Sequence, residues 1–356
     1  MVVTIPVKLV VSNELDEKLS LLASEQSKCA NYFVEVIKDK QSTSLKDLSG
    51  EPYFEAKRLF KLGSNLIQFA GYRAVTMMKV NHKTAKHSSK FNKVFLSLRE
   101  IKIDGFKVGL IFSDGSKRTW VEYLYKEPVS GTTKESILKK INGEWLCYLR
   151  IDRTEPKPKN YKRFMGVDLG IAKTAVTCDW NGKHTRFFNG EPYRFKKNHF
   201  MELRKGVEPK LKQGNVYKFL KRISKHEANW VTNENHKISR EIVNMAIKNK
   251  RSIALEKLTG ITERLKVHKK SRKMLKGWSF RQLADFIEYK AKLAGITVVY
   301  VDPRGTSKTC PKCQYCSRNN RRTQSVFKCR KCNYESNADR VGAINIAIRG
   351  NTVLSA

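Results

Sequence analysis

The chain has 356 residues, 40% of them hydrophobic and 10% aromatic, which is enough apolar material for a folded, soluble protein of two or three domains. Its 71 basic residues against 33 acidic ones give a formal net charge of +38, more than solubility needs, and this favours a polyanionic partner, above all nucleic acid. Composition alone leaves a nuclease, a passive ribosomal or chromatin-type binder and a protein of anionic membranes as alternatives.

The chain begins with a short apolar run, residues 2–10. This run lacks the charged region of a signal sequence and is too short to span a membrane, so we expect a cytoplasmic protein with no membrane partner. Five of the eight cysteines crowd between Cys310 and Cys332, which is unlike the even framework of a secreted disulfide protein. The remaining three stand in apolar contexts and are interpreted as core thiols: Cys29, Cys147 and Cys178.

Residues 1–155 are predicted to form an N-terminal β-barrel with a helical insertion. The expected elements are a strand, two helices and a series of short strands, over 2–11, 13–40, 52–80 and 92–153. Hairpin turns are indicated in the last of these ranges by Asp114-Gly115 and Asn142-Gly143. The stretch 154–160 is rich in Pro and Lys and breaks any regular element, so a domain boundary is placed there.

Residues 162–349 are predicted to form a second domain with an α/β fold. It opens with the run "RFMGVDLGIAKTAVTCDW", and "KHTRFF" follows Asn181-Gly182, which together predict a three-stranded meander. Helices and strands then alternate, and this implies a mixed sheet with helical layers. We expect helices over 192–250, a strand over 252–256, a helix over 279–294 and a strand over 296–301.

Four cysteines have the spacing of a metal site. The pattern C-x2-C-x15-C-x2-C, within the range for tetrahedral zinc, is formed by Cys310, Cys313, Cys329 and Cys332. Its halves resemble each other, "CPKCQY" and "CRKCNY", and the counterpart of Cys316 in the second half is Glu335. We therefore predict one structural Zn²⁺ in a ribbon over residues 306–336, with Cys316 as a bystander. The alternative is a set of unpaired cysteines on a basic loop.

The basic finger of this predicted ribbon, residues 318–322, has two open interpretations. It contains three arginines among its five residues, which suits contact with phosphates. A solvated loop tip explains the same composition equally well.

Three carboxylates follow or precede apolar segments. Asp168 ends the run that starts at Phe164, Glu256 ends "IALE", and Asp339 precedes an apolar helix from Val341 to Ile348. An ionised carboxylate beside buried residues is costly without compensation. Each also has a structural interpretation taken alone: Asp168 as a turn residue, Glu256 as an exposed strand end and Asp339 as a helix N-cap.

Taken together, the three carboxylates predict a divalent-metal site. Acids brought together repel one another unless cations stand among them, and two ions roughly 4 Å apart can activate water and stabilise the leaving oxygen of a phosphodiester. A basic surface would then deliver a polyanion to an acidic pocket. Asp168, Glu256 and Asp339 are therefore candidate catalytic residues and ligands of two Mg²⁺ ions.

Several motifs resemble a known family. Asp168 in "GVDLGIAKTAV", Glu256 in "IALEKL", "SFRQLADFIEYKAKLAGI", "PRGTSKTCPKC" and "NADRVGAINIA" are similar to the split RuvC nuclease domain of TnpB proteins and of type V CRISPR effectors. The order acid, acid, zinc ribbon, acid is specific, and the resemblance covers residues 162–349. The third motif commonly reads D-x-N-A-A-x-N, and here Val341 and Gly342 stand in place of Asn and Ala. That difference puts local packing in question rather than the acid.

The resemblance implies an RNase H-like (RuvC) fold, magnesium, a guide RNA from the transposon end and a double-stranded DNA target beside a short flanking motif. The N-terminal half, residues 1–155, would recognise the guide and the target. We therefore expect an RNA-guided DNA endonuclease. Three alternatives remain: a guided repressor that does not cleave, a compact CRISPR effector, and a transposase, for which no end-joining motif is visible.

A further basic segment, residues 261–278, lies between the second acid and the next predicted helix. It has no clear apolar period and is rich in Lys and Arg. We interpret it as a lid over bound nucleic acid, with a solvated loop as the alternative. The residues whose neutralisation would test the lid are Lys269, Lys270, Arg272 and Lys273.

Overall fold

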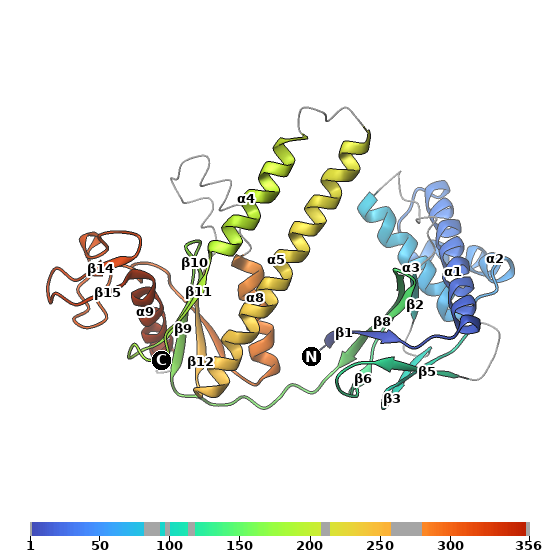
Figure 1. Cartoon of the computed structure of the whole chain (residues 1–356). Coiled ribbons are helices and arrows are strands. Elements are labelled where there is room, and N and C mark those ends of the chain that lie inside the picture. Colours follow the sequence, from blue (N-terminus) through green and yellow to red (C-terminus); the bar gives the residue numbers. More distant parts are fainter. Residues whose placement is uncertain are drawn as a thin grey trace. The chain divides into compact units, whose positions relative to one another are not determined.

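A computed structural model describes residues 2–81, 93–96, 100–112, 118–207, 214–257 and 280–353. The chain divides into two compact units, residues 1–154 and 155–356 (Figure 1). The Asp114-Gly115 turn and the basic segment 261–278 lie outside the described residues. No helix within the described ranges combines the length and apolar character that crossing a membrane requires.

The first unit is built on an eight-stranded antiparallel sheet of order β2-β7-β8-β1-β5-β4-β3, with β6 paired to β8. The strands are β1 (Val2–Leu9), β2 (Lys93–Leu96), β3 (Ile101–Asp104), β4 (Lys107–Leu110), β5 (Thr119–Leu124), β6 (Thr132–Thr133), β7 (Ser136–Ile141) and β8 (Glu144–Asp152). The central pair is β1 and β8, in which Val7 lies opposite Cys147. Among the described strands, β2 and β3 stand at the two ends of this order. The closure of the sheet into a barrel therefore stays a prediction.

Helices of the first unit share one apolar core with this sheet. They are α1 (Asn13–Asp39), α2 (Glu51–Leu59) and α3 (Ser64–Asn81), with a 3-10 turn, η1 (Leu45–Leu48). The helix predicted over 13–40 is confirmed, and it begins where Ser12 Oγ accepts a hydrogen bond from the backbone N of Leu15. The single helix predicted over 52–80 is wrong. Phe60 takes an extended backbone conformation and packs its ring on Tyr32, so the chain leaves the helix before Gly63.

The second unit surrounds a five-stranded sheet of order β11-β10-β9-β12-β13. The predicted meander is confirmed, because β9 (Phe164–Leu169), β10 (Lys173–Asp179) and β11 (Arg186–Asn189) are antiparallel neighbours. On the other side of β9 the sheet continues with β12 (Ser252–Glu256) and β13 (Val298–Val301), both parallel to it. The sheet is therefore mixed, with its direction changing at β9.

Helices lie on both faces of this mixed sheet (Figure 1). On one face, α5 (Gly214–Lys248) and α8 (Phe280–Leu293) share a core with β9 and β12 that includes Met165 and Ile253. On the other face, α9 (Ala338–Val353) packs Ile346 into a cluster with Phe164. A further helix, α4 (Glu191–Lys205), lies beside α5. The result is a three-layer α/β unit with the carboxyl ends of β9 and β12 in its central layer.

Helix α9 approaches β9 very closely. A Cβ atom at Gly166 would stand 2.0 Å from the carbonyl oxygen of Ala343, so only glycine admits the helix backbone there. The helix predicted from Val341 begins earlier, at Ala338. Asn337 caps it, because its Oδ1 accepts hydrogen bonds from the backbone N atoms of Asp339 and Arg340 at 3.0 and 3.2 Å.

Candidate metal centres

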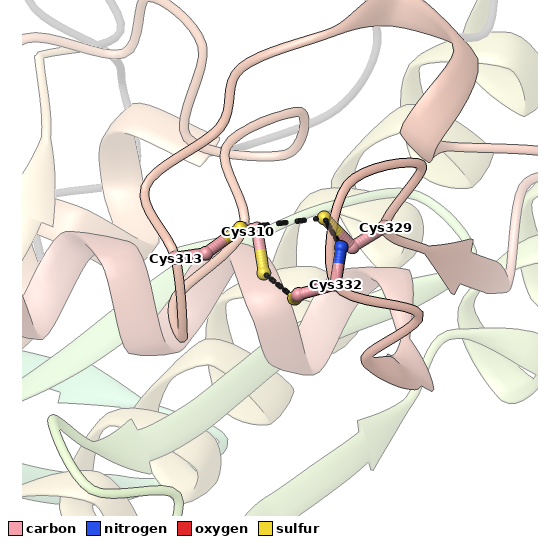
Figure 2. A group of neighbouring side chains, drawn as sticks. All are labelled: Cys310, Cys313, Cys329 and Cys332. Carbon is pink, nitrogen blue, oxygen red and sulfur yellow. Dashed lines mark hydrogen bonds between the residues drawn. The ribbon is translucent and has the colours of Figure 1, made fainter.

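The four predicted zinc ligands lie together in the segment between β13 and α9. Their sulfur atoms all lie within 4.8 Å of one another, and two cross-knuckle pairs are 3.6 and 3.5 Å apart (Figure 2). This spacing is far longer than a disulfide bond and suits four thiolates around one tetrahedral ion. Cys316 is exposed and is not among them. The group comprises Cys310, Cys313, Cys329 and Cys332.

The sequence similarity of the two knuckles is matched by their backbone. Gln314 and Asn333 occupy equivalent places and both have left-handed backbone angles, with φ of 60° and 56°. Each donates its backbone N–H to the carbonyl of the first cysteine of its knuckle, at 2.9 and 3.1 Å. Burial opposes ionisation of Cys329, but backbone N–H groups of Cys332 and Lys331 and the neighbouring thiols outweigh it and lower its pKa to about 6. Burial raises the pKa of Cys310 to about 12, and the pKa of Cys313 is raised as well. Cys329 is therefore the member of the cluster that favours thiolate, the form that binds metal.

The predicted carboxylates gather at one edge of the second unit's sheet. Val167 of β9 lies opposite Leu255 of the parallel strand β12, so Asp168 and Glu256 follow at the same level. Asp339 stands in the first turn of α9, and its charge acts on Asp168. Since Asn337 is the cap of that helix, the N-cap interpretation of Asp339 is wrong.

Electrostatics in this carboxylate site oppose ionisation. Burial raises the pKa of Asp168 well above its usual range, and the charges of Glu256 and Asp339 raise it further. Burial also raises the pKa of Glu256, against the opposing hydrogen bond from Thr306. The pKa of Asp339 is raised by burial, against the opposing charge of Arg321. Mutual repulsion of this kind is what a divalent cation among the carboxylates would relieve.

The carboxylates are not packed as tightly as the thiols. Within the described parts of the chain, the four thiols are the one set of three or more Cys, His, Asp or Glu side chains whose ligand atoms all lie within 4.8 Å. The three carboxylates therefore do not converge on one point. Their donor chemistry, oxygen only and with pKa values raised by burial and, at Asp168, by the other acids, fits hard divalent cations such as Mg²⁺.

Three residues at this site were not assigned a role from the sequence. Arg321, in the basic finger, donates from Nη2 to Asp339 Oδ1 at 3.2 Å, so this part of the finger is not a solvated tip. Thr306 donates to Glu256, and Asn345 contacts the turn that contains Thr306. The family motifs "PRGTSKTCPKC" and "NADRVGAINIA" contain Thr306 and Asn345. The contacts of all three residues join segments that are far apart in the chain.

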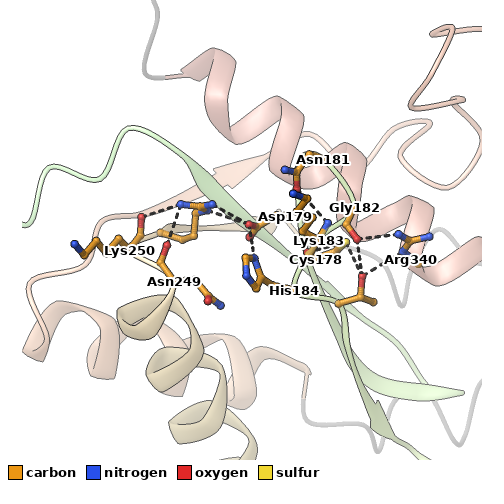
Figure 3. Close-up of polar contacts among 11 residues, drawn as sticks. Cys178, Asp179, Asn181, Gly182, Lys183, His184, Asn249, Lys250 and Arg340 are labelled. Atoms are coloured by element: carbon orange, nitrogen blue, oxygen red, sulfur yellow. Dashed lines mark hydrogen bonds and ion pairs between the residues drawn. The ribbon is translucent and has the colours of Figure 1, made fainter.

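A further buried acid lies at the opposite edge of the same sheet. Asp179 ends β10, which runs antiparallel to β9, so it pairs with Met165 rather than lying near Asp168. Its Oδ2 accepts from Arg251 at 3.1 Å and is 2.9 Å from His184 Nδ1 (Figure 3). Arg340, next to Asp339, turns away to the β10–β11 connection and donates to Gly182 O at 2.8 Å. Asp179 therefore forms an ion pair with Arg251 and is not a fourth member of the carboxylate site.

Comparison with known proteins agrees with this arrangement. The Cas12f1-like, TNB domain family matches residues 280–346. The solved Cas12f1-sgRNA-target DNA complex has a similar fold, with a TM-score of 0.63 at 18% identity over 95% of this chain and 83% of that one. The fold is thus a mixed α/β fold of the Cas12f and TnpB type.

Sequence relatives establish the family within that class. TnpB-like protein MJ0751 of Methanocaldococcus jannaschii is 32% identical over 195 residues, which are 53% of this chain and 69% of that protein. The chain belongs to the TnpB-like family. A CRISPR-associated endodeoxyribonuclease Cas12f1 of Sulfoacidibacillus thermotolerans is 30% identical over 259 residues. That match covers 67% of this chain and 58% of the relative, and a second Cas12f1, from Syntrophomonas palmitatica, is covered for 44% of its length. The chain thus spans about half the length of these two relatives.

Proposed function

We propose that the chain is an RNA-guided DNA endonuclease. The observation that carries the proposal is that β9, β12 and α9 bring Asp168, Glu256 and Asp339 to the same end of the sheet, with a pKa at Asp168 that is raised by burial and by the charges of the other two acids. Relatives named Putative RNA-guided DNA endonuclease InsQ, from Escherichia coli, and Cas12f1 support the same activity. The excess of positive charge supplies the general affinity for nucleic acid.

The second unit would be an RNase H-like (RuvC) nuclease domain. Supporting this are three antiparallel strands followed by two parallel ones, with acids at the carboxyl ends of the two central strands and a third acid on the last helix. The four-cysteine ribbon would hold one structural Zn²⁺. The first unit would recognise the guide RNA and the double-stranded target beside its flanking motif.

In the proposed reaction, Asp168, Glu256 and Asp339 supply the oxygen ligands for two Mg²⁺ ions. Bound Mg²⁺ would supply activation of water and stabilisation of the leaving oxygen of the phosphodiester. The pKa of Asp168 is raised by burial and by the charges of both other acids. Arg321 holds Asp339 through an ion pair, and Thr306 holds Glu256 through a hydrogen bond. These two contacts orient the carboxylates of Asp339 and Glu256.

A compact CRISPR effector is a second candidate, because two of the relatives at 30% identity or more are named Cas12f1. The chemistry would be the same and the origin of the guide would differ. A repressor that binds without cleaving is disfavoured, because all three acids are present and two lie at the same level of neighbouring strands.

The test is to purify the protein from cells that carry its own locus and to sequence the RNA bound to it. With a charge excess of this size, RNA should remain bound at moderate salt. A plasmid that matches the guide should be cut by the parent and left intact by Asp168→Ala. A preparation free of RNA that still cuts a chosen sequence would overturn the proposal. A transposon-end transcript would identify a TnpB nuclease, and a repeat-derived RNA would identify a CRISPR effector.

A further inference from the structure

Helix α9 reaches the three carboxylates in different ways. It bears Asp339, and it packs Gly342 against Asp168. One turn further on, Asn345 is 4% exposed, and its Nδ2 donates to the carbonyl oxygens of Thr306 and Thr309, both at 2.7 Å. Both amide protons are used on one turn of the chain, so this buried side chain fixes the turn that follows β13.

The turn held by Asn345 presents a hydroxyl group to the carboxylate of Glu256. Thr306 is also 4% exposed, and its Oγ1 donates to Glu256 Oε1 at 2.6 Å. The same hydroxyl stands 3.1 Å from Pro303 O. It has one proton, and the shorter contact to a charged acceptor is the stronger of the two. Glu256 ends β12, so without this bond its side chain could rotate over the sheet edge.

The same turn leads directly into the ribbon. Thr309 precedes Cys310, and both its backbone N and its Oγ1 donate to Gly305 O at 2.9 Å. A displacement of the first zinc knuckle would therefore reach Thr306 through a short, closed turn. Asn345 fixes this turn to the helix that bears Asp339, so this helix and this turn together contact all three acids.

We propose that Thr306 and Asn345 are positioning residues of the carboxylate site: Asn345 holds the turn, and Thr306 orients Glu256 so that its Oε2 is available to a divalent cation. The inference rests on the proposed nuclease function. A neutral hydroxyl suits this task, because it orients a ligating carboxylate without competing for its charge. Outer partners of this kind typically change metal affinity or activity by about 10–100-fold when they are removed.

The experiment measures Mn²⁺ binding to the full-length, zinc-loaded chain by calorimetry, and the Mg²⁺ dependence of guided cleavage. Thr306→Val keeps the shape of the side chain and removes its hydroxyl. We expect about tenfold weaker Mn²⁺ binding at the sites that Asp168→Ala abolishes, and a matching rise in the Mg²⁺ needed for cleavage. Thr306→Ser restores the hydroxyl and should bind Mn²⁺ within about twofold of the parent.

Thr309→Val is the matched control, because it removes a hydroxyl of the same turn that bonds Gly305 and not Glu256. It should bind Mn²⁺ like the parent, because the backbone N of Thr309 still donates to Gly305 O and keeps the turn closed. Parental Mn²⁺ affinity in Thr306→Val, or an equal loss in Thr309→Val, would contradict the positioning role of the hydroxyl. A parent whose Mn²⁺ binding is unchanged by Asp168→Ala would contradict the nuclease proposal instead.

The role of Asn345 is tested by a double-mutant cycle. Asn345→Ala should weaken Mn²⁺ binding through the released turn, and it should lower stability as well, since the carbonyls of Thr306 and Thr309 lose their partner. If Asn345 acts through Thr306, adding Thr306→Val to Asn345→Ala should weaken Mn²⁺ binding no further. Additive losses would show that Asn345 acts on the site by another route and would overturn this part of the inference.

Discussion

Gly342 of α9 lies directly against the carboxylate of Asp168: a Cβ atom on Gly342 would stand 2.5 Å from Asp168 Oδ2 and 3.3 Å from its Cγ. Glycine therefore allows the helix that bears Asp339 to approach the acid on β9. The third motif of the TnpB resemblance commonly has alanine at this position. The glycine is thus a local adjustment of packing around a retained acid, and the carboxylate of Asp168 occupies the space of the missing methyl group.

Gly342→Ala should lower cleavage without unfolding the protein. In a helix interior, alanine is more favourable than glycine by about 1 kcal/mol of folding free energy. This gain offsets much of the cost of the added contact. The atom that must move is the end of the Asp168 side chain, so the metal site changes more than the fold. We expect cleavage to fall about tenfold while the melting temperature stays within about 3 °C of the parent.

Gly350→Ala provides the contrast. Its Cβ would stand 2.7 Å from Ala254 Cβ and 2.9 Å from Phe164 Cγ, in the core and away from Asp168. Overpacking there should lower the free energy of unfolding by roughly 1–3 kcal/mol. A Gly342→Ala protein that loses as much stability as Gly350→Ala, with normal cleavage at low temperature, would contradict the role given to Gly342.

Arg321→Gln should destabilise the metal-free protein modestly. The Arg321 and Asp339 side chains are 24% and 16% exposed, so their ion pair is partly screened, and we expect a loss of about 1 kcal/mol by urea denaturation. The charge of Arg321 also opposes the raised pKa of Asp339. Arg318→Gln, an exposed arginine of the same finger, should change stability by less than about 0.5 kcal/mol. Equal losses of stability in the two variants would show that the ion pair between Arg321 and Asp339 contributes nothing to the free energy of unfolding.

Much of this arrangement could be predicted from the sequence, because it depends on local patterns. Apolar runs that end in an acid placed Asp168 within a strand and Glu256 at the end of one, and both lie there. Cysteine spacing and the repeated knuckle identified the four thiols that cluster. The break between α2 and α3 was missed, because Phe60 leaves the helix to pack on Tyr32, a contact made by tertiary structure.

The contacts that orient the acids could not be predicted, because they join distant segments. Arg321 lies in a finger whose composition also fits a solvated loop, and only the fold brings it to Asp339. Asp339 is a residue type that often caps helices and it precedes an apolar stretch, yet Asn337 caps α9. Nothing local distinguishes these two residues, since both precede the apolar stretch and both have a short side chain that accepts hydrogen bonds.

Removing a zinc ligand should release the metal and loosen the ribbon. Cys310→Ser or Cys329→Ser should reduce the zinc content from one ion per chain to none, because all four thiolates are needed to close a tetrahedral site. The melting temperature should fall as well, since metal binding contributes to folding. Cys316→Ser, at an exposed cysteine outside the cluster, should retain its zinc. Loss of zinc from that variant, measured by atomic absorption, would show the ligand assignment to be wrong.

The stability of the metal-free protein should depend on pH through Asp168. Its pKa is raised in the folded state, so the folded protein binds this proton more tightly than the unfolded chain. The resulting penalty is fully present above the folded pKa and disappears as pH falls towards the unfolded value. Asp168→Asn removes the penalty, and it should stabilise the protein more at about pH 8 than at about pH 5. Thermal unfolding in EDTA alone would also strip zinc, so the comparison is made in zinc-loaded, magnesium-free buffer.

Replacing any one of Asp168, Glu256 and Asp339 by Ala should abolish cutting and leave guided binding intact. Target recognition in an RNA-guided nuclease rests on base pairing and backbone contacts away from these acids. Cleavage should fall by roughly 10⁴-fold or more in magnesium, measured on a matched plasmid, while the affinity for target DNA is unchanged. Calcium should support binding but not cleavage, because its looser coordination fits a two-metal site poorly.

The three losses should not add, because the carboxylates act as one unit. If they hold the metal ions jointly, the first substitution removes most of the activity, and a double variant is little worse than either single one. Asp168→Ala should also leave the metal-free protein as stable as the parent or more so, because it removes the acid whose pKa is raised by burial and by the charges of the other two acids. The informative case is Asp339→Ala, since Arg321 then loses its partner. Near-parental cutting by Asp339→Ala in magnesium would remove that residue from the metal site and leave the ion pair with Arg321 as its role.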